Sequence, residues 1–253
     1  MTGVLELDIG NTRAKWRVLD ANRKPADRGH WAHSASALPA DSELDGMIES
    51  TQCERVRVGS VAAEELNQHL QEWATARKLN IQFAQTSVAC AGVSNSYDQP
   101  ERMGVDRWLA MLAAFNRYPG NICVIDCGTA LTLDVVTAVG KHLGGLIMPG
   151  VRLQQNALRQ HTDKVIFSKQ PDVGELRLGT DTPSCVHNGS MFMLVGAIHE
   201  VLLHAEQQLG ADVQCVISGG DAALLLPLLE PVLQEIVIEA PDIVLDGLQY
   251  ALP

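Results

Sequence analysis

Two short segments of the chain carry an aspartate, a glycine and hydroxyl or amide side chains at matching spacing. The first is DIGNT, Asp8–Thr12, and the second is DCGT, Asp126–Thr129. An aspartate at the end of a buried strand, followed by a glycine turn, presents a carboxylate beside several backbone N–H groups. Such a set suits a hydrated metal ion and phosphate oxygens. Lys15 follows the first turn and offers a point charge to a phosphate.

Either turn alone is compatible with an ordinary hairpin, in which Asp and Gly are favoured for turn conformation. Two copies at corresponding places favour the functional interpretation, and they indicate an internal repeat of about half the chain. We therefore expect two related lobes, residues 1–117 and 118–253, with a linker near Arg117–Asn121.

A third candidate is MGVDRW, Met103–Trp108, at the start of a segment with helical periodicity. Asp106 could cap free N–H groups and favour the helix dipole, or it could accept a proton from a substrate hydroxyl. Arg107 would keep Asp106 ionised and could pair with a substrate anion. Spacing alone leaves both interpretations open.

Glycines mark two further segments, GGLIMPG at Gly144–Gly150 and SGGD at Ser218–Asp221. Glycine at the end of a strand lets the backbone approach a ligand closely. Each segment, taken alone, is equally compatible with a plain turn.

Several common sites are excluded by their spacing. The chain has neither the Gly-x-x-x-x-Gly-Lys-Ser/Thr loop nor a Gly-x-Gly-x-x-Gly turn after a strand. His199 and His204 are five residues apart, so a helix places them on nearly opposite faces, unsuitable for one zinc ion. No Gly-x-Ser-x-Gly nucleophile motif occurs, and the six cysteines form no Cys-x-x-Cys pair.

The net charge and composition exclude some classes of binding partner, namely nucleic acids and anionic membranes. The 253 residues carry a net charge of −11 and are 46% hydrophobic, which indicates a packed protein without a general nucleic-acid or anionic-membrane surface. The N-terminal segment lacks the pattern of a signal peptide, and no apolar run approaches the ~18 residues of a membrane span. We therefore expect a cytoplasmic protein with reduced thiols, bound neither to nucleic acid nor to a membrane.

Hydrophobic periodicity predicts strands that alternate with helices, hence an α/β protein with mixed sheets. The predicted strands are Val4–Ile9, Ala14–Leu19, Val56–Ala62, Ile81–Ala84, Ile122–Cys127, Leu131–Ala138, Leu143–Met148, Val213–Ser218 and Glu235–Glu239. The predicted helices are Ala63–Lys78, Val105–Phe115, Val151–Arg159, Thr182–Leu209 and Ala222–Leu229, the last broken at Pro227.

Taken in order, these motifs resemble those of type III pantothenate kinases. Asp-x-Gly-Asn-Thr and Asp-x-Gly-Thr alone indicate the wider superfamily of sugar and acetate kinases, heat-shock ATPases and actin. The pattern Tyr-x-x-Pro-x-x-Met-Gly-x-Asp-Arg, followed by Asp-x-Gly-Thr-Ala, is more specific. The segments that carry the resemblance are DIGNTRAK (Asp8–Lys15), YDQPERMGVDRW (Tyr97–Trp108), DCGTALTLD (Asp126–Asp134), GGLIMPG (Gly144–Gly150), GTDT (Gly179–Thr182) and SGGDA (Ser218–Ala222).

The resemblance implies two duplicated ribonuclease-H-like lobes, with mixed sheets flanked by helices and a nucleotide cleft between them. It implies ATP with Mg²⁺ as phosphoryl donor and a monovalent cation, K⁺ or NH₄⁺. The implied reaction is phosphorylation of pantothenate to 4′-phosphopantothenate, the first step of coenzyme A biosynthesis, by a homodimer.

The same resemblance assigns roles to residues of this chain. For ATP it implies Asp8, Gly10, Asn11, Thr12, Lys15, Thr129, Gly219 and Gly220, with Asp8 near Mg²⁺ through water. For pantothenate it implies Tyr97, Gly104, Val105, Asp106, Arg107 and Thr182, with Asp106 as proton acceptor. Asp126 would ligate the monovalent cation. The family commonly has Gly-x-Asn-Thr where this chain has Asp181 before Thr182.

Two other functions remain compatible with the sequence. One is a transcription accessory or regulatory protein of the same family, and the other is a superfamily kinase acting on another small alcohol. A homodimer is also expected from the predicted helix Thr182–Leu209, which is apolar on more than one face. The residues behind that expectation are Met191, Phe192, Met193, Val195, Ile198, Val201 and Leu202.

Overall fold

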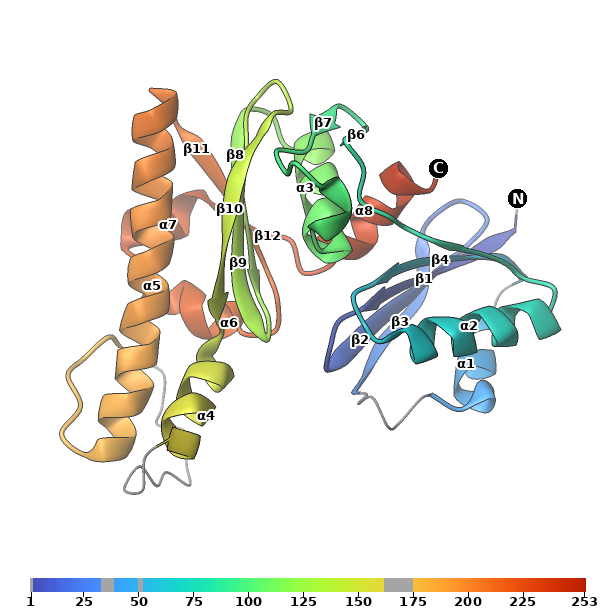
Figure 1. The fold of residues 1–253 in the computed structure, drawn as a ribbon, viewed down its shortest axis with the longest axis horizontal. Coiled ribbons are helices and arrows are strands. Elements are labelled where there is room, and N and C mark those ends of the chain that lie inside the picture. Colours follow the sequence, from blue (N-terminus) through green and yellow to red (C-terminus); the bar gives the residue numbers. More distant parts are fainter. Residues whose placement is uncertain (1, 33–38, 50–51, 162–174) are drawn as a thin grey trace. The chain divides into compact units, whose positions relative to one another are not determined.

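The computed structural model describes residues 2–32, 39–49, 52–161 and 175–253 (Figure 1). The chain forms two compact units, Met1–Arg117 together with Asp242–Pro253, and Tyr118–Pro241. This division differs from the predicted lobes, 1–117 and 118–253, at the end of the chain. The last helix, α8 (Ile243–Ala251), packs on α3 (Val105–Arg117) and on the first sheet, so its core contacts belong to the first unit.

The first unit is built on a five-stranded mixed sheet with strand order β3-β2-β1-β4-β5. The first three strands are antiparallel neighbours, whereas β1, β4 and β5 run parallel. These strands are β1 (Gly3–Ile9), β2 (Arg13–Leu19), β3 (Pro25–Ala32), β4 (Cys53–Ser60) and β5 (Asn80–Phe83).

Apolar and acidic side chains alternate along β1, so the apolar ones face the core of this unit and the acidic ones the opposite side of the sheet. Leu5, Leu7 and Ile9 are fully buried in the cluster that also holds apolar residues of α1 (Asp41–Ile48) and α2 (Glu64–Ala76). Successive strand residues point to opposite faces, so Glu6 and Asp8 lie on the other face, the one that α3 and α8 contact.

The second unit repeats this plan. Its sheet has the order β10-β9-β8-β11-β12, again with three antiparallel strands followed by two parallel ones. The strands are β8 (Asn121–Cys127), β9 (Ala130–Val136), β10 (His142–Pro149), β11 (Val213–Ser218) and β12 (Val237–Glu239). The identical order confirms the predicted α/β class and the duplication of a mixed, ribonuclease-H-like sheet.

One long helix, α5 (Thr182–Leu209), covers a face of the second sheet (Figure 1). Within the described ranges it is the one helix long and apolar enough to cross a membrane by length and composition alone. A core helix passes the same test, and Leu194, Ile198 and Leu202 of α5 are buried against β9 and β11.

That packing revises the sequence argument for a dimer. Four of the seven residues on which it rested, Met191, Val195, Ile198 and Leu202, are buried inside the unit, whereas Phe192 and Met193 are exposed. The remaining elements are short: β6 (Ala89–Cys90), β7 (Val93–Ser94), η1 (Pro100–Arg102), α4 (Val151–His161), α6 (Ala222–Leu225), η2 (Leu226–Leu228) and α7 (Pro231–Ile236).

Candidate active site

The first predicted phosphate turn joins β1 to β2. The N–H of Gly10 donates to the main-chain oxygen of Arg13 over 3.0 Å, which closes a turn whose tip, Asn11 and Thr12, is exposed. The strand register sets Asp8 directly opposite Lys15. The carboxylate and the ammonium group therefore come from cross-strand neighbours on one face of the sheet.

The second turn joins β8 to β9 and is one residue shorter than the first. The N–H of Gly128 donates to the main-chain oxygen of Ala130 over 3.0 Å. A Cβ on Gly128 would lie 3.2 Å from Oδ2 of Asp126, so the glycine leaves room for this carboxylate to fold over its own turn. Thr129 follows, next to the start of β9.

Two more glycines press against this second turn. A Cβ on Gly150 would lie 2.5 Å from the main-chain oxygen of Gly128, and a Cβ on Gly219 would lie 2.5 Å from the nitrogen of Cys127. Gly219 also has φ +99°, a conformation that other residues rarely adopt. The segment Gly219–Asp221 is fastened there, since the N–H of Asp221 donates to the oxygen of Cys127 over 2.9 Å. The ends of β8, β10 and β11 therefore meet beside Asp126. Gly220 lies in the segment that follows β11, between Gly219 and Asp221.

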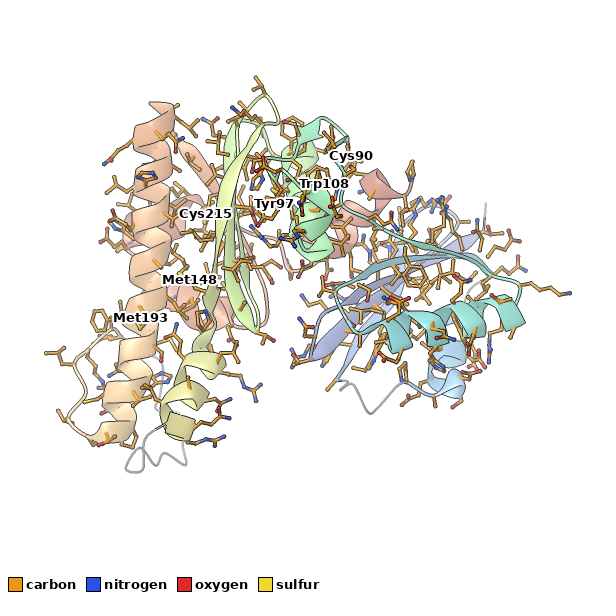
Figure 2. The ribbon with its side chains drawn as sticks, viewed as in Figure 1. Cys90, Tyr97, Trp108, Met148, Met193 and Cys215 are labelled. Carbon is orange, nitrogen blue, oxygen red and sulfur yellow. The ribbon has the colours of Figure 1, made fainter. Side chains whose placement is uncertain are left out.

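The predicted substrate residues of the first unit gather at the start of α3. Nη1 of the buried Arg107 donates to the hydroxyl oxygen of Tyr97 over 2.9 Å, and its guanidinium carbon lies 5.8 Å from the centre of the Tyr97 ring. Figure 2 shows Tyr97 beside this helix. An arginine held in this way presents donors that suit a carboxylate.

Asp106 is the second residue of α3, directly after Val105. Its Oδ1 accepts the N–H of Arg107 over 2.8 Å, so the carboxylate folds back over the free N–H groups of the first turn. A Cβ on Gly104 would lie 2.5 Å from the same Oδ1, and glycine is therefore what allows this position. The first-turn contact agrees with the capping interpretation and leaves room for proton acceptance, because a carboxylate accepts several hydrogen bonds.

One residue of this cluster was missed by the sequence reasoning. Asn95 accepts the N–H of Tyr97 on its side-chain oxygen over 2.9 Å, and its amide nitrogen lies 3.6 Å from Sδ of Met103. It thereby ties the segment that carries Tyr97 to the segment that precedes α3. The available signal was an asparagine two residues before a tyrosine, which is the spacing of an Asx turn.

Thr182 lies in the second unit, exposed at the first position of α5. The unexpected Asp181 is the N-cap of that helix, because its Oδ1 accepts the N–H of Ser184 over 2.8 Å. Hydrogen bonds from the hydroxyl and the N–H of Ser184 lower the pKa of Asp181. A Cβ on Gly179 would overlap the main chain of Ser184 and Cys185, so the GTDT segment is a glycine-dependent helix start.

The structure therefore groups the predicted site residues in two sets. The first unit brings together the turn with Asp8 and Lys15 on one strand pair, and Tyr97, Asp106 and Arg107 at α3. The second unit brings Asp126, Thr129, Gly219 and Gly220 to the end of β8, with Thr182 on α5. Among the residues that the structure describes, no three His, Cys, Asp or Glu side chains are arranged to hold a metal ion.

Comparisons with known proteins agree with the motifs and the fold. The sequence model described as "Type III pantothenate kinase" matches residues 4–204. A type III pantothenate kinase of Nitrosococcus oceani is 34% identical over 97% of this chain and 92% of its own length. One of Pseudomonas fluorescens is 36% identical over 99% of both chains.

A solved structure from Campylobacter jejuni, assigned to the Baf family of transcriptional activators, has a TM-score of 0.58. It is 19% identical and covers 97% of this chain and 95% of its own, a likeness that shows the fold alone. The family match over most of the chain and the near-full-length relatives go further than fold: this protein belongs to the type III pantothenate kinase family.

Proposed function

We propose that the protein transfers the terminal phosphoryl group of ATP to the primary alcohol of pantothenate, giving 4′-phosphopantothenate in the first step of coenzyme A biosynthesis. The observation that carries this proposal is the cluster of Tyr97, Asp106 and Arg107 at the start of α3. The cluster combines a carboxylate that can take a proton with a fixed guanidinium. These two groups match the hydroxyl and the carboxylate of pantothenate. Family membership supports the same reaction.

The chemistry asks little of the base. Phosphoryl transfer passes through a loose transition state, so alignment and charge neutralisation supply most of the rate. Asp106 orients the hydroxyl and takes its proton late in the step. Arg107, with Tyr97 against its guanidinium, binds the pantothenate carboxylate, and Gly104 and Val105 line the same segment. Thr182, of the second unit, is assigned to pantothenate by the family resemblance.

ATP is assigned to the two glycine turns. In the first unit, Asn11, Thr12 and the N–H groups near Gly10 bind the phosphates, with Lys15 as the nearby point charge. Thr129, Gly219 and Gly220 of the second unit are assigned to the nucleotide by the family resemblance. Mg²⁺ fits one carboxylate, Asp8, because this ion keeps several waters and binds through one or two carboxylates and the phosphates. When bound, it neutralises charge on the transferred phosphate.

Asp126 is assigned to the monovalent cation. Its carboxylate lies beside Gly128, where main-chain oxygens of a tight turn are close at hand. A carboxylate and main-chain oxygens form an all-oxygen set of ligands. Such a set suits a hard cation such as K⁺ better than it suits a soft metal ion. We assign the enzyme to the cytoplasm, where ATP and K⁺ are abundant.

A homodimer is proposed from the outer surface of α4 and α5. Met193, labelled on α5 in Figure 2, is exposed. The exposed fractions are 65% for Met193 and 44% for Phe192 of α5, and 43% each for Leu153 and Leu158 of α4. Light scattering should give twice the monomer mass, and Phe192→Ser with Met193→Ser should lower it. A wild-type monomer at assay concentration would refute the dimer.

The function is tested by ADP release with ATP, Mg²⁺ and a panel of small alcohols, with and without K⁺. Pantothenate should be the preferred acceptor, mass spectrometry should find the phosphorylated product, and K⁺ should raise turnover. Preference for another alcohol would replace the proposed substrate. Tight, salt-sensitive binding of duplex DNA without kinase activity would instead favour the regulatory alternative.

A further inference from the structure

The terminal helix α8 is held against the first unit by arginines from several strands. Arg28 of β3 lies 3.6 Å from the carboxylate of Asp242, just before the helix. Arg55 of β4 donates to the main-chain oxygens of Leu252 and Pro253 over 3.2 and 2.7 Å, just after it. The segment is thus fastened at both ends.

Asp246 is the fastening point in the middle, and both of its oxygens are used. Nη1 of Arg17, on β2, donates to Oδ1 over 2.6 Å, and Nη1 of Arg117, the last residue of α3, donates to Oδ2. The Asp246 side chain is 15% exposed. One carboxylate therefore links three elements that are distant in sequence.

The ion pairs continue from Arg17 into the sheet. Its Nε donates to Oε2 of Glu6 over 2.7 Å, and Nη1 of Arg57 donates to Oε1 of the same carboxylate over 3.2 Å. Glu6 is fully buried. The result is a continuous chain of charges from β4 through β1 and β2 to α8 and α3.

The pKa shifts of Arg17 and Arg57 show how burial and attraction to the acidic partners oppose each other along this row of charges. Burial lowers the pKa of Arg57 despite its contact with Glu6. Burial also lowers the pKa of Arg17, but attraction and hydrogen bonds from Glu6 and Asp246 outweigh it, so its pKa is raised overall. Arg17 thus depends on both acids. Loss of the Asp246 charge would leave a largely buried guanidinium with one acidic partner instead of two.

The positions of these residues relate them to the proposed chemistry. Glu6 and Arg17 form the cross-strand pair next to Asp8 and Lys15 on the same face of the sheet. Arg117 ends the helix whose first turn carries Asp106. A Cβ on Gly247, beside Asp246, would overlap the main-chain oxygen of Leu109, so α8 and α3 pack with their backbones in contact.

We propose that Asp246 is a positioning residue for phosphoryl transfer: through Arg17 and Arg117 it fixes the helix that carries Asp106 relative to the strand pair that carries Asp8 and Lys15. The inference rests on the proposed function for the roles of those residues. Asp246 is assigned no substrate contact, because its two oxygens accept from Arg17 and Arg117. Its effect is on alignment, and a misplacement of about 1 Å can cost ~10²-fold in rate.

The test uses the full-length protein with Asp246→Asn, which keeps the side-chain size and removes the charge. We expect kcat to fall about tenfold or more while the KM values for ATP and pantothenate stay within about threefold, because each substrate keeps its own contacts. Asp246→Glu should recover part of the loss. Arg117→Gln, which removes the more exposed arm of the pair, should give a smaller fall in a protein that still folds.

Asp45→Asn is the matched control. Asp45 of α1 also binds an arginine, Arg77, and accepts a hydrogen bond from Trp73 over 3.0 Å, but these partners belong to α2 and its C-cap and not to α3 or β2. A general loss of stability would affect both variants, whereas lost alignment should affect Asp246→Asn alone. Equal kcat values in the two variants would overturn the proposal.

Hydrogen exchange separates this inference from the proposed function. Asp246→Asn should speed exchange in peptides covering Gly104–Leu109 and Gly10–Lys15, and Asp45→Asn should not. Unchanged exchange in both peptides would overturn the positioning role whatever the substrate is. If the wild type fails to phosphorylate pantothenate, the proposed function falls, and the exchange result still decides whether Asp246 holds the two elements.

Discussion

Three glycines of the second unit separate backbone strain from crowding. Gly120 and Gly219 have nearly equal φ values, +97° and +99°, but a Cβ on Gly120 meets nothing within 4 Å, whereas a Cβ on Gly219 overlaps Cys127. Gly150 is crowded by Gly128 and Thr129 at 2.5 and 2.7 Å. Gly120→Ala therefore applies backbone strain alone, and Gly219→Ala applies strain and crowding together. Gly150→Ala applies crowding without a positive φ.

The expected costs follow from those contacts. A strained backbone conformation costs ~1–3 kcal/mol, and an extra carbon in a packed site costs about the same. Gly120→Ala should lower the free energy of unfolding by the first amount alone. Gly219→Ala should lower it by roughly the sum, ~2–6 kcal/mol. Because the crowded atoms belong to the turn that carries Thr129, Gly150→Ala and Gly219→Ala should also raise the KM for ATP.

Urea unfolding of the three variants and the wild type measures the first effect, and steady-state kinetics at varied ATP measures the second. Gly120→Ala serves as the control, since it carries the strain without the contact and should leave the KM for ATP near that of the wild type. If Gly219→Ala proves no less stable than Gly120→Ala, the close packing of Gly219 on Cys127 is not what the glycine provides, and the reasoning fails.

Three further outcomes are expected. Lys15→Met should raise the KM for ATP by about 10–100-fold, since a hydrogen bond to a charged group contributes ~1.5–3 kcal/mol; an unchanged KM would remove Lys15 from the phosphate site. Asp126→Asn should weaken the response of kcat to K⁺, with partial recovery at high K⁺, and an unaltered K⁺ titration would contradict its assignment. Burial lowers the pKa of His187, so the unfolded chain binds the proton more tightly. Stability should therefore be full above pH ~6.5 and fall as the pH drops toward the folded pKa; urea unfolding at pH 7.5 and 5.5 should show this fall in the wild type and less of it in His187→Gln.

Local patterns predicted the elements whose signal is local. The two hairpins, β11 and α5 follow from alternation, glycine turns and helical periodicity, and the structure confirms them. Strand β3 (Pro25–Ala32) was missed because it is an edge strand that is mostly exposed, so it lacks apolar alternation. Helix α8 was missed as well, since Gly247 interrupts its pattern and its packing partner, Leu109, is far away in sequence.

In the candidate site, too, local patterns predicted the turn residues but not the long-range contacts. Turn residues such as Gly10, Gly128 and Gly219 are recognisable because a tight turn needs glycine wherever it occurs. The link between Arg17 and Asp246 spans 229 positions, and no local pattern indicates that a buried arginine will find that partner. The sequence therefore predicted the glycine turns that we assign to the phosphates, and not the contacts that hold their elements together.

The most direct test of the proposed reaction is the turnover of Asp106→Asn with saturating ATP, Mg²⁺, pantothenate and K⁺. Asparagine keeps the size and caps a helix about as well as aspartate, so fold and ATP binding should persist. The account predicts that kcat falls by about 10²–10⁴-fold, the usual contribution of a positioned proton acceptor, and that added K⁺ does not restore it. A folded Asp106→Asn enzyme with kcat within about threefold of the wild type would show that Asp106 is a helix cap and not the base.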